Sequence, residues 1–125
     1  YELIKQHPVI GAKIIRPIGL PTPVHEIILQ HHEWFNGNGY PYGLTGNQIS
    51  PLARIVTIAD AYDAMTSKRA YRENLDAESA RQEVINNVGI QFDPDYGRVF
   101  FDYYSQIIEP VSDSPAIQNL LFDML

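Results

Sequence analysis

Four prolines, each at the start of an apolar-periodic stretch, constrain the fold of this chain more than any other feature. They are Pro8, Pro23, Pro51 and Pro94. Proline suits the first turn of a helix, because the N–H that it lacks would have no helical partner there. Apolar residues follow each proline at the three- and four-residue spacing of a buried helix face, and Asp76 offers an N-cap for a further helix. No segment reads convincingly as a strand, so the sequence predicts an all-α fold with about five helices.

One long loop interrupts this helical pattern. Residues 34–50 contain four of the eight glycines and Asn-Gly turn signals, which exclude a long helix. After a Ser-Asp-Ser hinge, residues 115–125 place apolar side chains at helical spacing. We therefore expect a unit over residues 1–109 and a tail with a short amphipathic helix over residues 110–125. The chain starts in apolar-periodic sequence without Met, so we expect a bundle that is incomplete at its N-terminus.

Composition excludes several classes of function. Nine Lys and Arg against fifteen Asp and Glu give a net charge of −6, which disfavours binding to bulk nucleic acid. The chain has no cysteine, so a bound metal would need His, Asp and Glu as ligands. No stretch reaches the roughly 18 apolar residues of a membrane-spanning helix, and we expect a soluble chain.

Three histidines are candidates for a metal site. His31 and His32 are adjacent at the predicted end of a helix, and His7 precedes the first helix-starting proline. Adjacent helical residues diverge by about 100°, so the pair can converge only where the helix ends. Alone, the pair is more typical of a core histidine beside a surface cap, and His7 alone is more typical of a cap.

Asp60 shifts the interpretation of these histidines toward a metal site. It lies in the middle of a predicted helix among apolar residues, where we expect it to be buried and to need a cation. The positive charge could come equally from an arginine, Arg54 or Arg69, or from a metal ion. Three imidazoles and a carboxylate suit Fe, Mn, Zn, Ni or Co better than Ca.

Further polar residues flank these candidates. Glu33 and Asp63 could orient a histidine or bind a ligand amide. Lys68, Arg69 and Arg72 place three cations within five residues of an otherwise acidic chain. Such residues commonly complement the C-terminal dipole of a helix, but guanidinium groups also bind phosphate oxygens in pairs.

Five short motifs together resemble the HD-GYP family. They are His-Pro-x-x-Gly at 7–11, His-His-Glu at 31–33, Gly-Tyr-Pro at 39–41, Ala-Asp-x-Tyr-Asp-Ala-x-Thr at 59–66, and Arg-x-Tyr-Arg at 69–72. Their order and spacing make the resemblance specific. It covers about residues 1–108 and implies the helical bundle of the HD superfamily.

The resemblance implies a metal-dependent phosphodiesterase that hydrolyses the bacterial second messenger cyclic di-GMP to pGpG and GMP. Two or three divalent ions are expected in the intact parent, Fe or Mn first and Zn, Ni or Co as alternatives. The expected metal ligands are His7, His31, His32 and Asp60. The expected substrate-binding residues are Arg69, Arg72, Asp63, Tyr40 and Lys68. The loop at Gly39, Tyr40 and Pro41 is expected to shape the pocket and to dock signalling proteins. The expected location is the cytoplasm, including for a parent with sensor or membrane domains upstream.

One departure from the family pattern limits these expectations. The His-Asp doublet that names the family does not occur in this sequence. The Asp of that doublet normally bridges two metals, and four side-chain ligands are too few for a two-metal site, so this chain alone is expected to bind metal weakly and to hydrolyse little. The alternative is a catalytically inactive module that senses cyclic di-GMP or docks proteins in bacterial signalling. A weaker alternative is an enzyme of the wider His-Asp phosphohydrolase group that acts on another nucleotide. We also expect exposed apolar faces on the helices containing Ile14, Ile27 and Ile58, and hence a homo-oligomer or swapped dimer.

Overall fold

The computed structural model describes residues 2–113 of the chain, and this part is helical. The α-helices are α1 (His7–Ile15), α2 (Thr22–Gln30), α3 (Pro51–Thr66), α4 (Ala77–Asn86), α5 (Pro94–Asp102) and α6 (Tyr104–Asp113). Single 3-10 turns occur at η1 (Ile4–Gln6), η2 (Arg16–Ile18) and η3 (Gly46–Gln48). Within residues 2–113 there is no strand, only isolated bridges, so the all-α prediction is confirmed.

The helix starts follow local chemistry. Proline occupies the first or second position of α1, α2, α3 and α5, as the sequence predicts. The Asp76 carboxylate caps α4 by accepting the backbone N–H of Ser79 at 2.8 Å. Asp93 caps α5 in the same way. Ser50 stands at the N-cap of α3, but its side chain makes no capping hydrogen bond.

Apolar residues follow Pro94 at helical spacing through Ile108 and predict one helix there; this prediction is wrong as a single element, because the helix breaks at Tyr103. There the backbone has φ −110° and ψ 12°. The Tyr104 hydroxyl then bonds the Tyr62 hydroxyl at 2.8 Å and the Ala77 carbonyl at 3.0 Å, which ties α6 to the rest of the bundle. The predicted boundary at residues 109–110 falls inside α6, and the helix expected over residues 115–125 lies outside the described part.

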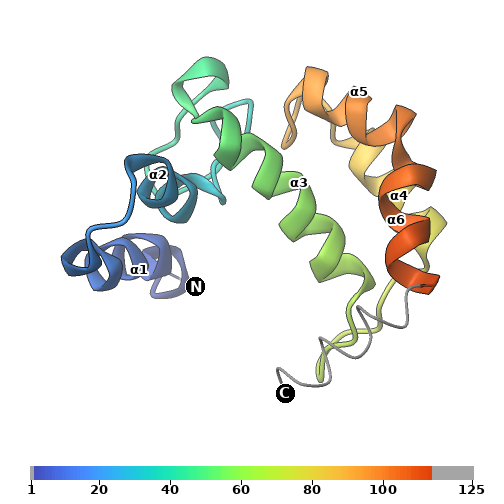
Figure 1. Cartoon of the computed structure of the whole chain (residues 1–125), viewed down its shortest axis with the longest axis horizontal. Coiled ribbons are helices and arrows are strands. Elements are labelled where there is room, and N and C mark those ends of the chain that lie inside the picture. The colour runs from blue at the N-terminus through green and yellow to red at the C-terminus, as the bar shows by residue number, and fades with distance from the viewer. Residues whose placement is uncertain (1, 114–125) are drawn as a thin grey trace.

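The helices pack mainly in chain order, with α3 in the middle (Figure 1). α1 and α2 lie on one side of α3, while α4, α5 and α6 lie on the other. The buried core on the second side consists of Ile58, Val84, Phe92 and Phe100. On the first side, α3 packs on α2, and its buried Thr57 bonds the carbonyl of His31 at the end of α2. The bundle therefore bends around α3 and leaves a hollowed inner face.

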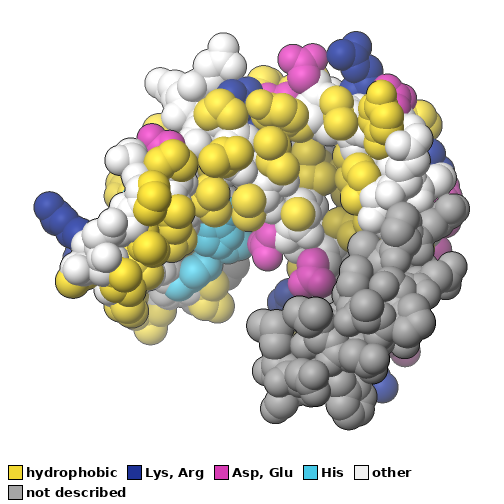
Figure 2. Space-filling view, viewed as in Figure 1, with side chains coloured by type: hydrophobic (Ala, Val, Ile, Leu, Met, Phe, Trp, Pro, Cys, Tyr) yellow, Lys and Arg dark blue, Asp and Glu magenta, His cyan; other side chains and the backbone are white. Residues whose placement is uncertain are grey.

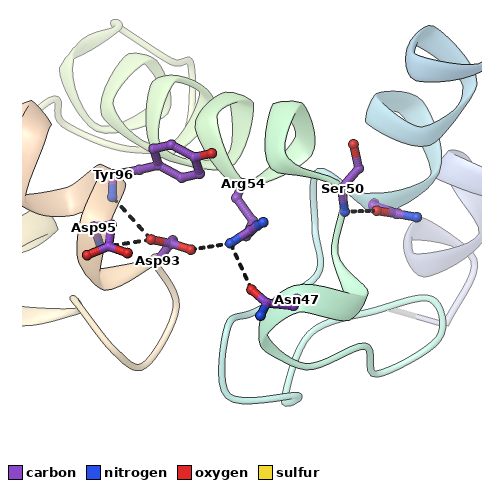
Figure 3. A network of polar contacts seen from close by, with 7 residues as sticks. Asn47, Ser50, Arg54, Asp93, Asp95 and Tyr96 are labelled. Atoms are coloured by element: carbon purple, nitrogen blue, oxygen red, sulfur yellow. Dashed lines mark hydrogen bonds and ion pairs between the residues drawn. The ribbon is translucent and has the colours of Figure 1, made fainter.

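A buried ion pair holds the start of α3 to α5 (Figure 3). Arg54 Nη1 lies 2.6 Å from Asp93 Oδ2, and the two side chains are 14% and 4% exposed. The same guanidinium reaches Asn47 Oδ1 at 3.5 Å and lies over the Tyr96 ring. Arg54 is thus committed to Asp93 and is not the partner of Asp60 that the sequence allowed.

The expected exposed apolar faces are only partly present. Ile14 is 68% exposed, whereas Ile58 is 5% exposed because α4 and α5 cover it. Ile27 is half-buried, and the large exposed apolar residues of α3 are Leu52 and Ile55. No helix within residues 2–113 has the length and apolar character needed to cross a bilayer.

Candidate metal centre

Three histidines that are distant in sequence form one cluster. His7 is the first residue of α1, while His31 and His32 follow the last turn of α2. One ring nitrogen of each lies within 4.8 Å of the other two. Figure 2 shows histidine side chains gathered on the inner, hollowed face, with acidic side chains beside them. Because α2 ends at Gln30, the adjacent pair can converge, as the sequence predicts.

Backbone carbonyls orient two of these rings. His7 Nδ1 lies 2.6 Å from the Ile4 carbonyl, and His31 Nδ1 lies 2.9 Å from the Ile28 carbonyl. A carbonyl only accepts hydrogen bonds, so each Nδ1 must carry the proton. In the neutral ring each Nε2 then keeps its lone pair, which is the arrangement found in metal-bound histidines.

His32 is held in its neutral form. Burial, followed by the neighbouring His31 and His7, lowers the pKa of His32 to about 4, while Asp60 acts in the opposite direction. The Tyr40 ring stacks on the His32 ring with centroids 4.9 Å apart and planes 21° apart. At neutral pH this imidazole is therefore uncharged and fixed beside the other two.

Asp60 differs from the prediction. It is exposed, so the expectation that it is buried and therefore needs a cation is wrong. Of the apolar residues before it in sequence, Ile58 lies in the buried core, whereas Ala59 is exposed like Asp60. Asp60 is nevertheless close enough to influence the pKa of His32, and it forms no salt bridge with Arg69 among the described residues. Its role as a metal ligand stays a prediction.

Thr57 is a functional candidate that the sequence analysis missed. Its buried hydroxyl lies 3.0 Å from the His31 carbonyl and 2.8 Å from the Ala53 carbonyl of its own helix. It therefore links α3 to His31, the C-cap residue of α2. In the sequence, Thr57 is a hydroxyl residue among apolar helical residues, and this could have indicated a polar contact. Such a hydroxyl more often bonds only the carbonyl one turn earlier in its own helix.

Hydrogen bonds to His32 and to the neighbouring Glu33 hold the loop after α2. The Tyr40 N–H donates to the His32 carbonyl at 3.1 Å. Glu33, only 1% exposed, accepts the N–H groups of Tyr42 and Leu44 at 2.7 and 2.9 Å. Glu33 was expected to orient a histidine or a ligand, but its carboxylate instead holds the loop backbone. The metal cluster and the loop thus meet at the segment 31–33, where His31 and His32 belong to the cluster and His32 and Glu33 hold the loop.

Gly39 is required by a close approach rather than by its φ angle. A Cβ there would lie 2.5 Å from Glu33 Cα and closer still to the backbones of His32 and Trp34. Gly37, with φ 88°, supplies the sharp turn that the sequence predicts. The Tyr40–Pro41 peptide bond is cis.

The three cations lie in an exposed loop beyond α3. Lys68, Arg69 and Arg72 line a hollow of about 620 Å³ together with Tyr71 and Asn74. None of the three forms a salt bridge within the described residues. Their phosphate-binding role stays a prediction.

Asp63 lies near the C-terminal end of α3 and bonds the residue that follows this helix. Its carboxylate accepts the Ser67 hydroxyl at 3.0 Å. Its predicted contact with substrate also stays a prediction.

Comparison with known proteins identifies the family. The HD domain family model matches residues 1–96. The chain belongs to the HD domain family. It is 38% identical over 101 residues to a cyclic di-GMP phosphodiesterase of Pseudomonas aeruginosa, covering 80% of this chain and 24% of that protein. The HD-GYP assignment made from the motifs is confirmed.

Solved structures agree with the helical fold. A cyclic GMP-AMP-specific phosphodiesterase of Vibrio cholerae superposes with a TM-score of 0.75 over 97% of this chain and 28% of that one, at 24% identity. An HD-GYP-type protein of Bdellovibrio bacteriovorus, Bd1817, gives 0.66 over 83% of this HD domain chain and 33% of its own, at 28% identity. The chain spans about a quarter to a third of the length of such relatives.

Proposed function

We propose that this HD domain chain contributes part of the active site of a metal-dependent phosphodiesterase that hydrolyses cyclic di-GMP to pGpG and GMP. The observation that carries the proposal is the cluster of His7, His31 and His32, whose ring nitrogens lie within 4.8 Å of one another. The unit over residues 1–109 would hold this part of the site. The cyclic di-GMP phosphodiesterase named among its relatives supports the substrate class.

The cluster fits a divalent transition metal. Two of its histidines have Nδ1 tied to backbone carbonyls, so Nε2 is available, and His32 is neutral. With Asp60 as the fourth ligand, the donor set favours Fe or Mn, with Zn, Ni or Co as alternatives. Two or three ions would be completed by ligands elsewhere in the intact parent. When bound, the metal supplies Lewis acidity to the phosphodiester and to the attacking water.

The remaining residues would bind and enclose the substrate. Arg69 and Arg72, with Lys68, would hold the phosphate groups through charge-assisted hydrogen bonds. Asp63 would accept a hydrogen bond from the ligand, and Tyr40 would exclude water from the face of His32. The Gly39–Pro41 segment would also serve as a docking surface for signalling proteins in the cytoplasm.

The test compares metal content and cyclic di-GMP turnover of the full-length protein with those of His31→Ala and Asp60→Ala. His25→Ala is the matched control, because His25 also lies in α2 but outside the cluster. We expect both site variants to lose metal and at least about a hundredfold in turnover, and the control to keep both.

Two outcomes would contradict the proposal. Unchanged turnover in both site variants would remove these residues from the active site. Cyclic di-GMP binding without turnover in the metal-loaded wild type would favour the sensing or docking module instead.

A further inference from the structure

Two side-chain hydrogen bonds join the end of α2 to α3. The side-chain oxygen of Gln30, the last residue of α2, accepts the backbone N–H of Ser50 at 2.6 Å (Figure 3). The second bond is the one from the Thr57 hydroxyl to the His31 carbonyl, at 3.0 Å. Because Gln30 and His31 are consecutive, both bonds act on the short segment that carries the histidine pair.

The Ser50 N–H depends on Gln30 for its hydrogen bond. Ser50 is the N-cap of α3 and Pro51 follows it, so this N–H lies before the helix and takes no part in its ladder. It donates to no backbone carbonyl within residues 2–113. Ser50 is half-buried, and an N–H left there without an acceptor is unfavourable. The Gln30 side chain is therefore held to the start of α3.

The backbone of Gln30 belongs to the turn that carries His31 and His32. Its carbonyl accepts the Glu33 N–H at 2.9 Å, which closes this turn around the two histidines. The side-chain NH₂ of Gln30 makes no hydrogen bond with the described residues, so its oxygen makes the one tie of this side chain there. Gln30 thus holds the turn through its backbone and α3 through its side chain.

Together the two bonds fix how α3 lies against the histidine pair. Ser50 and Thr57 are seven positions apart, close to two turns, so they lie on one side of α3 about 10 Å apart along its axis. A single bond would let α3 pivot about one point, whereas two bonds on the same side prevent this. Asp60 is three positions beyond Thr57 and neighbours it on the helix surface. The two bonds therefore also set where Asp60 stands.

From these contacts we propose that Gln30 is a positioning residue, whose bond to Ser50 holds α3 so that Asp60 stands beside the histidine cluster as the fourth metal ligand. The inference rests on the proposed function, in which Asp60 completes the donor set. It adds a residue that acts through α3 rather than by contact with metal or substrate. Without the bond, α3 can pivot about Thr57 and carry Asp60 away from the histidines. Metal–ligand distances tolerate only about 0.2 Å, so a small pivot is sufficient.

The test is a calorimetric titration of the metal-free full-length protein with Mn²⁺. Gln30→Met removes the acceptor at similar side-chain length, and we expect about tenfold weaker Mn²⁺ binding. Gln30→Asn, one methylene too short to reach Ser50, should show the same loss and serves if methionine disturbs folding. Gln30→Glu keeps an acceptor oxygen and should restore the affinity.

Gln48→Met is the matched control. The same substitution there breaks two hydrogen bonds to Thr45, at 2.9 and 3.0 Å, in the loop before α3. Neither bond joins α2 to α3, so this variant should keep the wild-type affinity for Mn²⁺. A loss equal to that of Gln30→Met would overturn the inference, because any broken bond in the loop would then suffice.

A double-mutant comparison separates positioning from general stability. If Gln30 acts through Asp60, Asp60→Ala should weaken Mn²⁺ binding by at least about tenfold in the wild type but by less than about threefold in Gln30→Met. Equal losses in the two backgrounds, or wild-type affinity in both Gln30→Met and Gln30→Asn, overturn the inference whatever the turnover of cyclic di-GMP. Affinity that depends on Gln30 through Asp60 in a protein without turnover supports the inference and removes the phosphodiesterase proposal.

Discussion

Replacing Gly39 with alanine tests how closely the loop and the histidine pair depend on each other. The added Cβ would lie 2.5 Å from Glu33 Cα, whereas ordinary contacts begin near 3.4 Å. The obstructing atoms are backbone and cannot rotate away. The loop would therefore have to retreat by about 1 Å, which lengthens every hydrogen bond that holds it.

Three hydrogen bonds set the size of the effect. The bond from Tyr40 N–H to the His32 carbonyl is neutral and contributes about 1 kcal/mol. The two bonds from Tyr42 and Leu44 to the buried Glu33 carboxylate contribute about 2 kcal/mol each. We therefore expect Gly39→Ala to lower the free energy of unfolding by about 5 kcal/mol, or to detach the loop and weaken metal binding.

Gly19→Ala is the matched control. Gly19 has φ 72° but nothing within 4 Å of an added Cβ, so alanine there brings only backbone strain of about 1 kcal/mol. Urea unfolding and metal titration of both variants provide the comparison. A Gly39 variant as stable as the Gly19 variant, with wild-type metal affinity, would refute the reasoning.

Three further predictions concern other contacts. Thr57→Val should weaken metal binding by about tenfold, because the His31 carbonyl loses its hydrogen-bond donor. Thr57→Ser should restore the wild-type affinity in metal titrations. Equal metal affinities of the wild type and Thr57→Val would exclude a positioning role. Asp93→Ala should lower the free energy of unfolding by about 3 kcal/mol in urea, since Arg54 is left buried without its partner; a loss below about 1 kcal/mol would equate the pair with surface ion pairs. A hydrogen bond from the backbone of α4 holds the pKa of Asp76 below its usual 3.8, so this cap stabilises the fold above that pH and its contribution is lost as pH falls through the lower, folded-state pKa. Asp76→Asn should flatten that acid dependence in denaturation curves, and an unchanged dependence would count against it.

Local chemistry explains why the helix starts were predictable. A proline or a capping aspartate acts on residues one to three positions away, so Pro51 and Asp76 carry their structural consequence in the sequence itself. The convergence of His31 and His32 was predictable for the same reason, because it depends only on where α2 ends. The break at Tyr103 was not, because apolar spacing continues on both sides of it.

Asp60 marks the limit of periodicity. Spacing tells which residues share a side of a helix, but it does not tell which side its neighbours cover. The helices that pack on α3 are distant in sequence. α2 begins 29 positions before α3, and α4 and α5 follow α3. Only their packing left Asp60 exposed near the histidines and covered Ile58.

The sequence by itself determined the helical class, the helix starts, the family and the histidine pair, because each rests on residues close together in the chain or on motifs in a fixed order. The motifs also implied that His7 belongs with that pair, and the tertiary structure brings it there. Tertiary structure alone decided that Thr57 bonds the His31 carbonyl and that Trp34 and Glu83 line one hollow. These contacts join residues that are 24 or more positions apart. Packing of α1 on α2, and of α2 and α4 on α3, brings them together, and no local pattern encodes it.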